Sequence, residues 1–277
     1  MNEPSCPWPR QFERWRMDDS ATQAAYDTTG PTLRQSLKNG IAAAYWHFGR
    51  EAGILSGARR DAARGFSSGS LDCPADWTLL LVGPEFDAPA RLAAAAILPR
   101  LAGVELVGAL FSDALPDHGL LLGLALSGCE DVFLMPAGAL AHGLPSIPGR
   151  GVVFFLHEGS LAGSASNARA DGLACLDESR KPRLGVAEPE LVDRQSLIFC
   201  QGEAGRLALD SPVDLSDCDA IYGVGNSCLP DSRSPRLAMS PGLEGFWLHE
   251  SAGPENFRMR RLTIARLEAD SVFPDFA

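Results

Sequence analysis

Short apolar runs alternate with helix-forming segments through the middle of this chain, and this alternation restricts the fold more than any other feature. The run from Trp77 to Val82 is almost entirely apolar, which is typical of a strand buried on both faces. Strands separated by helices predict βαβ crossovers and a mainly parallel sheet, so we expect an α/β fold. The expected strands are 77–82, 105–111, 131–134 and 152–156, and the expected helices are 88–102, 120–127 and 137–143.

The flanking segments have weaker patterns. Pro31 suits the first position of a helix, and apolar residues then recur every three or four positions as far as Phe48, so 31–48 is a predicted helix. Residues 1–30 are polar and rich in turn formers, and we expect an irregular arm; residues 56–76 are rich in Gly and Ser and indicate a connector. Further candidate strands are 197–200, 220–222 and 245–248, while 257–267 fits a strand or a helix.

Charge and cysteine usage exclude several classes of function. The formal net charge of −11 gives the chain no electrostatic reason to cover a phosphate backbone, so we expect no nucleic-acid partner. No apolar run reaches the roughly 20 residues of a membrane span. The seven cysteines are scattered, without a C-x-x-C pair, and the first residues lack the order of a secretory signal. We therefore expect a cytoplasmic protein with reduced thiols.

Several segments occur in the order found in one enzyme family. Pro99 to Val104 is similar to its Pro-Ala-x-x-Ala-Gly-Val turn, and Leu124 to Phe133 resembles its Ala-Ala-x-x-Ala-Gly-Val stretch. Pro136 to Ala141 lies where the family has Gly-Gly-Ala-Gln-Ala-Ile-Ala, and Glu250 to Gly253 repeats its late Glu-Ser-Ala-Gly. In this collinear order the chain resembles the histidinol dehydrogenases, which oxidise histidinol to histidine with zinc and NAD.

The resemblance implies two Rossmann-like lobes with mainly parallel sheets, in which one domain interrupts the other. Residues 77–165 would form the first lobe, and residues 31–76 with 166–277 the second. Because the family dimerises through intertwined subunits, the resemblance also implies a homodimer. A small metabolite in the cleft between the lobes is the expected ligand.

The family's catalytic residues are not matched. Its zinc ligands come from a Gln-x-x-His helix, an Asp after Glu-Ser-Ala-Gly and a histidine in a carboxy-terminal tail. This sequence has no Gln-x-x-His, Pro254 follows Gly253, and the chain stops at Ala277, so we expect the tail to be missing and no metal site. The general base of the family belongs to a Glu-His dipeptide, which occurs here only in reverse order. Together these departures argue against zinc-dependent dehydrogenation.

Coenzyme binding also lacks its usual motif. The turn after the first expected strand holds only Gly83, followed by Glu85 and Asp87, whose carboxylates would repel a pyrophosphate. We therefore expect no NAD. The loop Gly223-Val224-Gly225-Asn226 could hold an anion through backbone N–H groups, although a tight turn without a ligand explains it equally well.

The remaining site candidates are two reversed dipeptides. His157-Glu158 and His249-Glu250 each follow an expected strand, where open α/β sheets place their ligands. The simpler interpretation is that each histidine caps a strand end. The basic residues Arg258, Arg260, Arg261 and Arg266 fit either an anion clamp or a solvated strand face.

Three hypotheses follow. The first is a histidinol-dehydrogenase-like protein without zinc chemistry that binds a small metabolite. The second is an active NAD-dependent oxidoreductase with a site rebuilt from His157, Glu158, His249 and Glu250, which requires these four side chains to converge. The third is a regulatory or interaction protein, which requires an exposed apolar patch.

Overall fold

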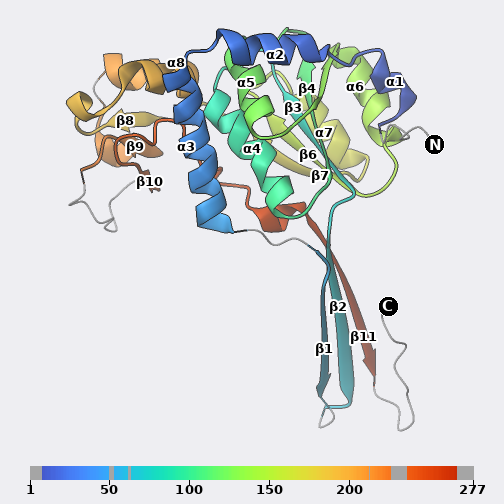
Figure 1. Ribbon diagram of the computed structural model, residues 1–277. Coiled ribbons are helices and arrows are strands. Elements are labelled where there is room, and N and C mark those ends of the chain that lie inside the picture. The colour runs from blue at the N-terminus through green and yellow to red at the C-terminus, as the bar shows by residue number, and fades with distance from the viewer. Residues whose placement is uncertain (1–7, 50–52, 62–63, 212, 226–235, 267–277) are drawn as a thin grey trace.

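The body of the molecule is built on a five-stranded parallel sheet (Figure 1). The computed structural model describes residues 8–49, 53–61, 64–211, 213–225 and 236–266. The sheet has the order β5-β4-β3-β6-β7, and every neighbouring pair is parallel. Its strands are β3 (Trp77–Val82), β4 (Leu106–Ser112), β5 (Asp131–Met135), β6 (Gly151–Leu156) and β7 (Ala174–Glu178).

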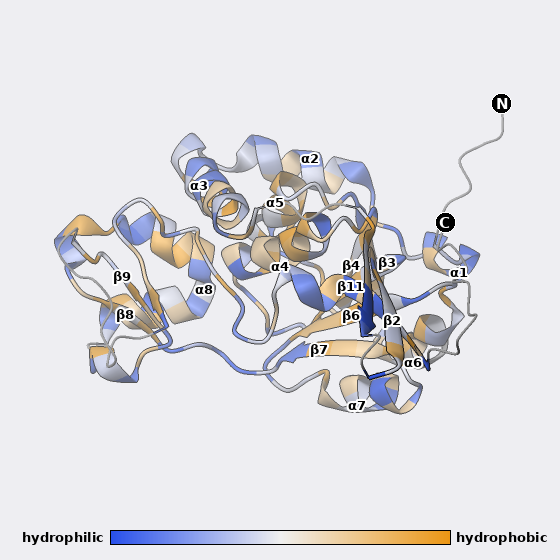
Figure 2. Ribbon diagram, turned by 90° about the horizontal axis from the view of Figure 1, so that it is seen from below, coloured by the Kyte–Doolittle hydropathy of each residue, from blue (hydrophilic) through white to orange (hydrophobic). Residues whose placement is uncertain are grey.

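Helices cover both faces of this sheet, as the apolar runs of its strands require. Every residue of β3 and β6 is buried. Alternate side chains of β3 enter two separate clusters: Leu80 packs toward α4 (Pro89–Leu101) and α5 (His118–Leu126), and Leu79 packs toward α6 (Ala137–Gly143) and α7 (Ala162–Ala170). Figure 2 shows the two layers on opposite sides of the strands. The predicted α/β class and all four predicted strands of this unit are confirmed.

The amino-terminal segment is more regular than expected. Two helices, α1 (Arg10–Glu13) and α2 (Asp19–Thr28), occupy residues for which we expected an irregular arm, so that prediction is wrong for both segments. Asp18 caps α2 by accepting a hydrogen bond from the backbone N–H of Ser20, and α2 then packs on α5. The cap and the tertiary contact outweigh a polar composition.

A second group of elements lies beside α4. The predicted helix α3 (Pro31–Phe48) is confirmed and packs on α4 and α8 (Arg194–Asp210). A small parallel sheet of order β10-β9-β8 packs against α8; its strands are β8 (Leu184–Val186), β9 (Ala220–Tyr222) and β10 (Leu237–Ala238). Short 3-10 helices connect these parts at η1 (Leu144–Ser146), η2 (Pro189–Leu191), η3 (Leu215–Asp217) and η4 (Pro254–Phe257).

A three-stranded antiparallel sheet extends away from the body (Figure 1). We call it the arm; its strands are β1 (Leu55–Asp61), β2 (Phe66–Pro74) and β11 (Arg258–Arg266). Most of the segment 56–76, for which we expected a connector, therefore forms the two strands β1 and β2. Residues 257–267 fitted a strand or a helix, and residues 258–266 form a strand. The pairing of β2 with β11 joins segments that are far apart in sequence, which no local pattern reveals.

Three further expectations are corrected. Residues 197–200 lie inside α8 and do not form a strand, because a four-residue apolar run fits a buried helix face equally well. Residues 245–248 form no strand, whereas the strand at 220–222 is confirmed as β9. The first sheet continues past residue 165, since β7 pairs with β6. Among the described helices, none is long and apolar enough to cross a membrane.

Candidate functional site

A cleft of about 220 Å³ opens where β7 ends and the chain passes toward the small sheet. Its wall includes Glu178, the linker residues Ser179 and Arg180, and, from segments distant in sequence, Arg91, Asp219 and Trp247. The carboxyl end of a parallel strand is where open α/β sheets bind ligands. The fold therefore places a mixed-charge cleft at the position where a ligand is expected.

All four predicted site residues contact the segment 177–181, which forms the end of β7 and the start of the linker. They contact this segment and not one another in any polar interaction of the described residues. The four pairs are His157 with Asp177 at 3.1 Å, His249 with Glu178 at 2.8 Å, Glu250 with Arg180 at 3.5 Å, and Glu158 with Lys181 at 3.3 Å.

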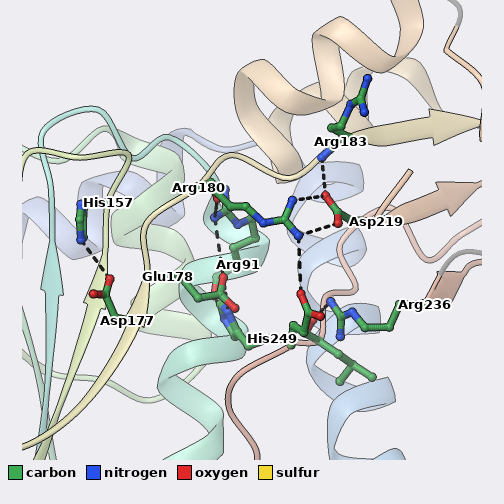
Figure 3. Close-up of polar contacts among 11 residues, drawn as sticks. Arg91, His157, Asp177, Glu178, Arg180, Arg183, Asp219, Arg236 and His249 are labelled. Atoms are coloured by element: carbon green, nitrogen blue, oxygen red, sulfur yellow. Dashed lines mark hydrogen bonds and ion pairs between the residues drawn. The ribbon is translucent and has the colours of Figure 1, made fainter. Parts of the chain in front are cut away.

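The two histidines lie on opposite faces of β7. Successive residues of a strand point to opposite sides of a sheet, so a ring bound to Asp177 and a ring bound to Glu178 are separated by the strand itself. Figure 3 shows His157 with Asp177 on one side and His249 near Glu178 on the other. His157 is fully buried, and its Nδ1 accepts a hydrogen bond from the N–H of Gly159. The two histidine rings therefore do not meet at one reaction centre.

Glu178 is the electrostatic centre of the cleft wall. Its Oε2 lies 2.8 Å from Nδ1 of His249 and 3.8 Å from the guanidinium of Arg91. Burial on its own would raise the pKa of Glu178, but His249, Arg91 and Arg236 outweigh burial and lower the pKa to about 2. His249 also contacts the backbone carbonyl of Arg91 through Nε2, at 2.9 Å. Both contacts of His249 hold parts of the wall together.

Arg180 and Asp219 join the two sheets across the cleft. The guanidinium of Arg180 donates to both carboxylate oxygens of Asp219, at 2.9 and 2.7 Å, and the backbone N–H of Arg183 also donates to Asp219. A bidentate pair of this kind fixes orientation as well as charge. Asp219 is therefore already neutralised by the protein.

Arg91 and Trp247 are cleft residues that the sequence reasoning missed. Arg91 is 1% exposed, and its guanidinium lies over the rings of Phe86 and Trp247. Among the described residues, neither the Nε–H of Arg91 nor the buried indole N–H of Trp247 has a hydrogen-bond partner. A buried donor without an acceptor costs about 1–3 kcal/mol. One signal was present in the sequence: Arg91 interrupts an otherwise apolar first turn of an Ala-rich helix.

The turn after β3 is filled by the protein's own carboxylate. Glu85 accepts hydrogen bonds from the backbone N–H groups of Glu158 and Ser160 and from the Ser160 hydroxyl, at 2.6, 3.1 and 2.8 Å. Burial alone would raise the pKa of Glu85, but these hydrogen bonds outweigh it and lower the pKa. A Cβ on Gly83 would meet Ser160, so the glycine allows this close packing. These residues do not fit a pyrophosphate, because a carboxylate already occupies the N–H donors.

The glycine-rich loop after β9 lies apart from the cleft. Gly223 has a φ of +69°, which only glycine adopts without strain, and it packs against Val192 and the backbone of Glu188. Gly225 lines a separate groove of about 560 Å³ together with Trp46 and Phe246. Asn226, the last residue of the predicted loop, lies outside the described residues. The structure therefore does not bring Gly223 or Gly225 to Arg91.

Metal ligands do not assemble in the part of the chain that the structure describes. No group of three or more His, Cys, Asp or Glu side chains is placed to hold an ion there. Pro254, which follows the Glu-Ser-Ala-Gly segment, is buried in η4 and offers no ligand atom. The basic residues of β11 lie on the arm, and Arg258 donates to Asp72 at 2.7 Å. The described residues thus do not fit a zinc site.

The structure is similar to solved dehydrogenases, although no protein-family model and no curated protein matches the sequence. Histidinol dehydrogenase from Elizabethkingia anophelis aligns with a TM-score of 0.59 over 91% of this chain and 77% of its own, at 11% identity. Methylmalonate-semialdehyde dehydrogenase from Oceanimonas doudoroffii (TM-score 0.37, 16% identity) and aldehyde dehydrogenase from Brucella melitensis (0.37, 12%) align over 75% and 74% of this chain and half of theirs. The first alignment confirms the predicted histidinol-dehydrogenase-like fold.

Proposed function

We propose that this chain binds a small metabolite in the cleft at the end of β7, and that it does so without the zinc-dependent oxidation for which the similar fold is named. The single observation that carries this proposal is the cleft itself. It has a volume of about 220 Å³, and it is walled by Glu178 of the large sheet and by Asp219 and Trp247 of the second group of elements. Sites for drug-sized ligands have volumes of roughly 300–1,000 Å³, so this one suits a smaller molecule.

Two features support binding without redox chemistry. The described residues lack a set of metal ligands, and Glu85 occupies the backbone donors at which a dinucleotide would be held. The rebuilt-oxidoreductase hypothesis required His157 and His249 to converge, but each ring contacts a different face of β7. These features support a role in holding a ligand for the residues that surround the cleft.

A thermal-shift series with the intact chain tests this proposal. The probes are zinc chloride, NAD, imidazole, L-alanine, succinate and inorganic phosphate, because a ligand that binds only the native state raises the Tm. We expect a saturable rise with at least one of the small organic or inorganic probes and none with zinc or NAD. Ser251 lines the cleft, so Ser251→Trp should remove the rise.

The matched control is Ser166→Trp, which introduces the same side chain on the exposed surface of α7 and should leave the rise unchanged. Zinc-dependent reduction of NAD by this chain in the presence of histidinol would overturn the proposal. A Tm that none of the small organic or inorganic probes changes would also overturn the proposal.

A further inference from the structure

The charged groups of the cleft are unequally compensated. Glu178 contacts His249, Asp219 accepts three hydrogen bonds from Arg180 and Arg183, and Asp177 contacts His157 and Arg169. Each of these carboxylates thus already has a basic side chain as a partner within the protein. Glu250, the remaining acidic residue of the wall, is an exposed side chain at the rim and lies 3.5 Å from Arg180.

The donors of the cleft lack comparable partners. Within the described part of the chain, Arg91 donates one long hydrogen bond, from Nη2 to the Arg180 carbonyl at 3.4 Å, and forms one ion pair, with Glu178 at 3.8 Å. A guanidinium has five N–H donors in a planar fork and stays charged even when buried. Burial of Arg91, which disfavours its charge, lowers its pKa in spite of Glu178. A buried and under-coordinated cation is therefore present in the wall of the cleft.

The indole of Trp247 adds a second donor at the same place. Its buried N–H has no acceptor in the described ranges of the chain, and the Arg91 guanidinium lies 5.8 Å from the centre of its ring. The guanidinium of Arg236 lies on the same ring at 5.8 Å and donates to the Leu248 carbonyl. Two guanidinium groups therefore lie near one aromatic ring whose N–H, like the Nε–H of Arg91, has no acceptor among the described residues.

We propose that the cleft binds an oxyanion, a carboxylate or phosphate group carried by a small metabolite, through the Arg91 guanidinium and the Trp247 indole N–H. This inference rests on the function proposed above and names its ligand class. A planar guanidinium matches either oxyanion with two parallel hydrogen bonds, and the indole supplies a third donor. Of the local carboxylates, Asp219 is held by the bidentate contact with Arg180, and Glu178 lies closer to His249, at 2.8 Å, than to Arg91, at 3.8 Å.

The test is calorimetric titration of the intact chain with succinate, inorganic phosphate and ethylamine at constant ionic strength. We expect succinate or phosphate to bind saturably and ethylamine not to bind, and the tighter of the two anions identifies the oxyanion. Trp247→Phe keeps an aromatic ring and removes the indole N–H, so it should weaken anion binding about tenfold, as for one hydrogen bond to a charged group. Arg91→Met should abolish anion binding.

The matched control is Trp15→Phe, because Trp15 also has a buried N–H without a partner but lies outside the cleft. This variant should bind the anions as the parent chain does. Should Arg91→Met fail to fold, as judged by its circular dichroism, Trp247→Phe decides the assignment of the site.

Three results would overturn the inference, and they can be told apart. Binding of imidazole in the cleft without binding of any probe that carries a carboxylate or phosphate leaves the proposed function standing and removes the oxyanion. Anion binding that Trp247→Phe and Arg91→Met leave unchanged removes the site. Absence of binding by every probe removes the proposed function as well.

Discussion

At the scale of single residues, the contacts of Glu178 make an acid-sensitive point in the fold. Its pKa is about 2 in the folded protein, below the usual 4.5, because His249 and Arg91 favour the carboxylate. A lowered folded-state pKa stabilises the native state above pH 4.5, and this contribution is lost as the pH falls from about 4.5 to about 2. This loss of stability at low pH arises from protonation of the Glu178 carboxylate, so it is absent when the side chain at this position cannot ionise.

We therefore expect Glu178→Gln to lower the free energy of unfolding at pH 7, by at most about 3 kcal/mol, as a shift of this size implies. Urea denaturation at pH 7 and near pH 2 measures the effect, and the two proteins should differ least at the lower pH. Glu105→Gln, an exposed substitution away from the cleft, serves as the control and should leave the pH dependence unchanged. An equal loss of stability at both pH values would contradict the ionic role of Glu178.

At the scale of elements, α3 is held against the 240–246 loop by two glycines. A Cβ on Gly40 would overlap the carbonyl of Gly245, and a Cβ on Gly245 would overlap the carbonyl of Ser36. The helix and the loop therefore approach at backbone distance. Gln201 of α8 adds a hydrogen bond to the Glu244 carbonyl of the same loop, at 3.0 Å.

Gly40→Ala should destabilise the protein by at least about 1–3 kcal/mol, because overpacking must push the loop away from α3. Chemical denaturation measures this. The matched control is Gly138→Ala in α6, where a Cβ would meet nothing within 4 Å, and the better helix propensity of alanine should raise stability by about 0.5–1 kcal/mol. A gain of stability in both variants would show that α3 and the loop are not in tight contact.

The elements also show which predictions the local sequence could support. The helix 31–48 and the strands of 77–156 were predicted because their apolar period repeats over several turns or fills a whole strand. The arm was missed because Ser- and Gly-rich residues 66–74 become a strand only when they pair with 258–266. Likewise, the run at 197–200 was assigned the wrong class because its partners in α3 and β8 lie far away in sequence.

At the scale of the whole molecule, one face of the arm is incompletely covered. The antiparallel registers place Leu55, Phe66, Leu262 and Ile264 on the same face, and each is more than half exposed. Small residues such as Ser68 and Ser70 lie between them. The same registers place Arg59, Arg260 and Arg266 on this face, so its exposed apolar side chains are interspersed with cations, and we treat the face as a candidate interaction surface.

The charge and size of the arm suit a second copy of the chain. Its segments 54–74 and 258–266 hold seven arginines and two aspartates, within a chain whose net charge is −11, so the arm is basic and the rest is acidic. Three strands about 30 Å long offer about 400 Å² on one face. In a two-fold symmetric dimer, the arm of each chain would pack on the other chain. Each of the two contacts would bury about 400 Å² on the arm and about 400 Å² on its partner, or about 1,600 Å² in total, which is the size of a typical stable interface.

We therefore expect a homodimer whose stability falls as the salt concentration rises. Light scattering after size exclusion, in low and high salt, measures it. The double substitution Leu262→Ser and Ile264→Ser should give a monomer, whereas Thr263→Ser on the other face should not. A parent chain that stays monomeric at micromolar concentration in low salt would refute this expectation.

The sequence by itself determined the parallel α/β unit, because the burial of a strand or helix is recorded in the period of its apolar residues. It also determined which family motifs are absent, since Pro254 has no ligand atom whatever the fold. Only the tertiary structure determined which side chains lie together at the candidate cleft. His157 and His249 are separated because they contact adjacent residues of β7, whose side chains point to opposite faces of the sheet. Arg91 lies near Trp247 because the packing of distant segments brings them together, and a local sequence pattern does not predict such packing.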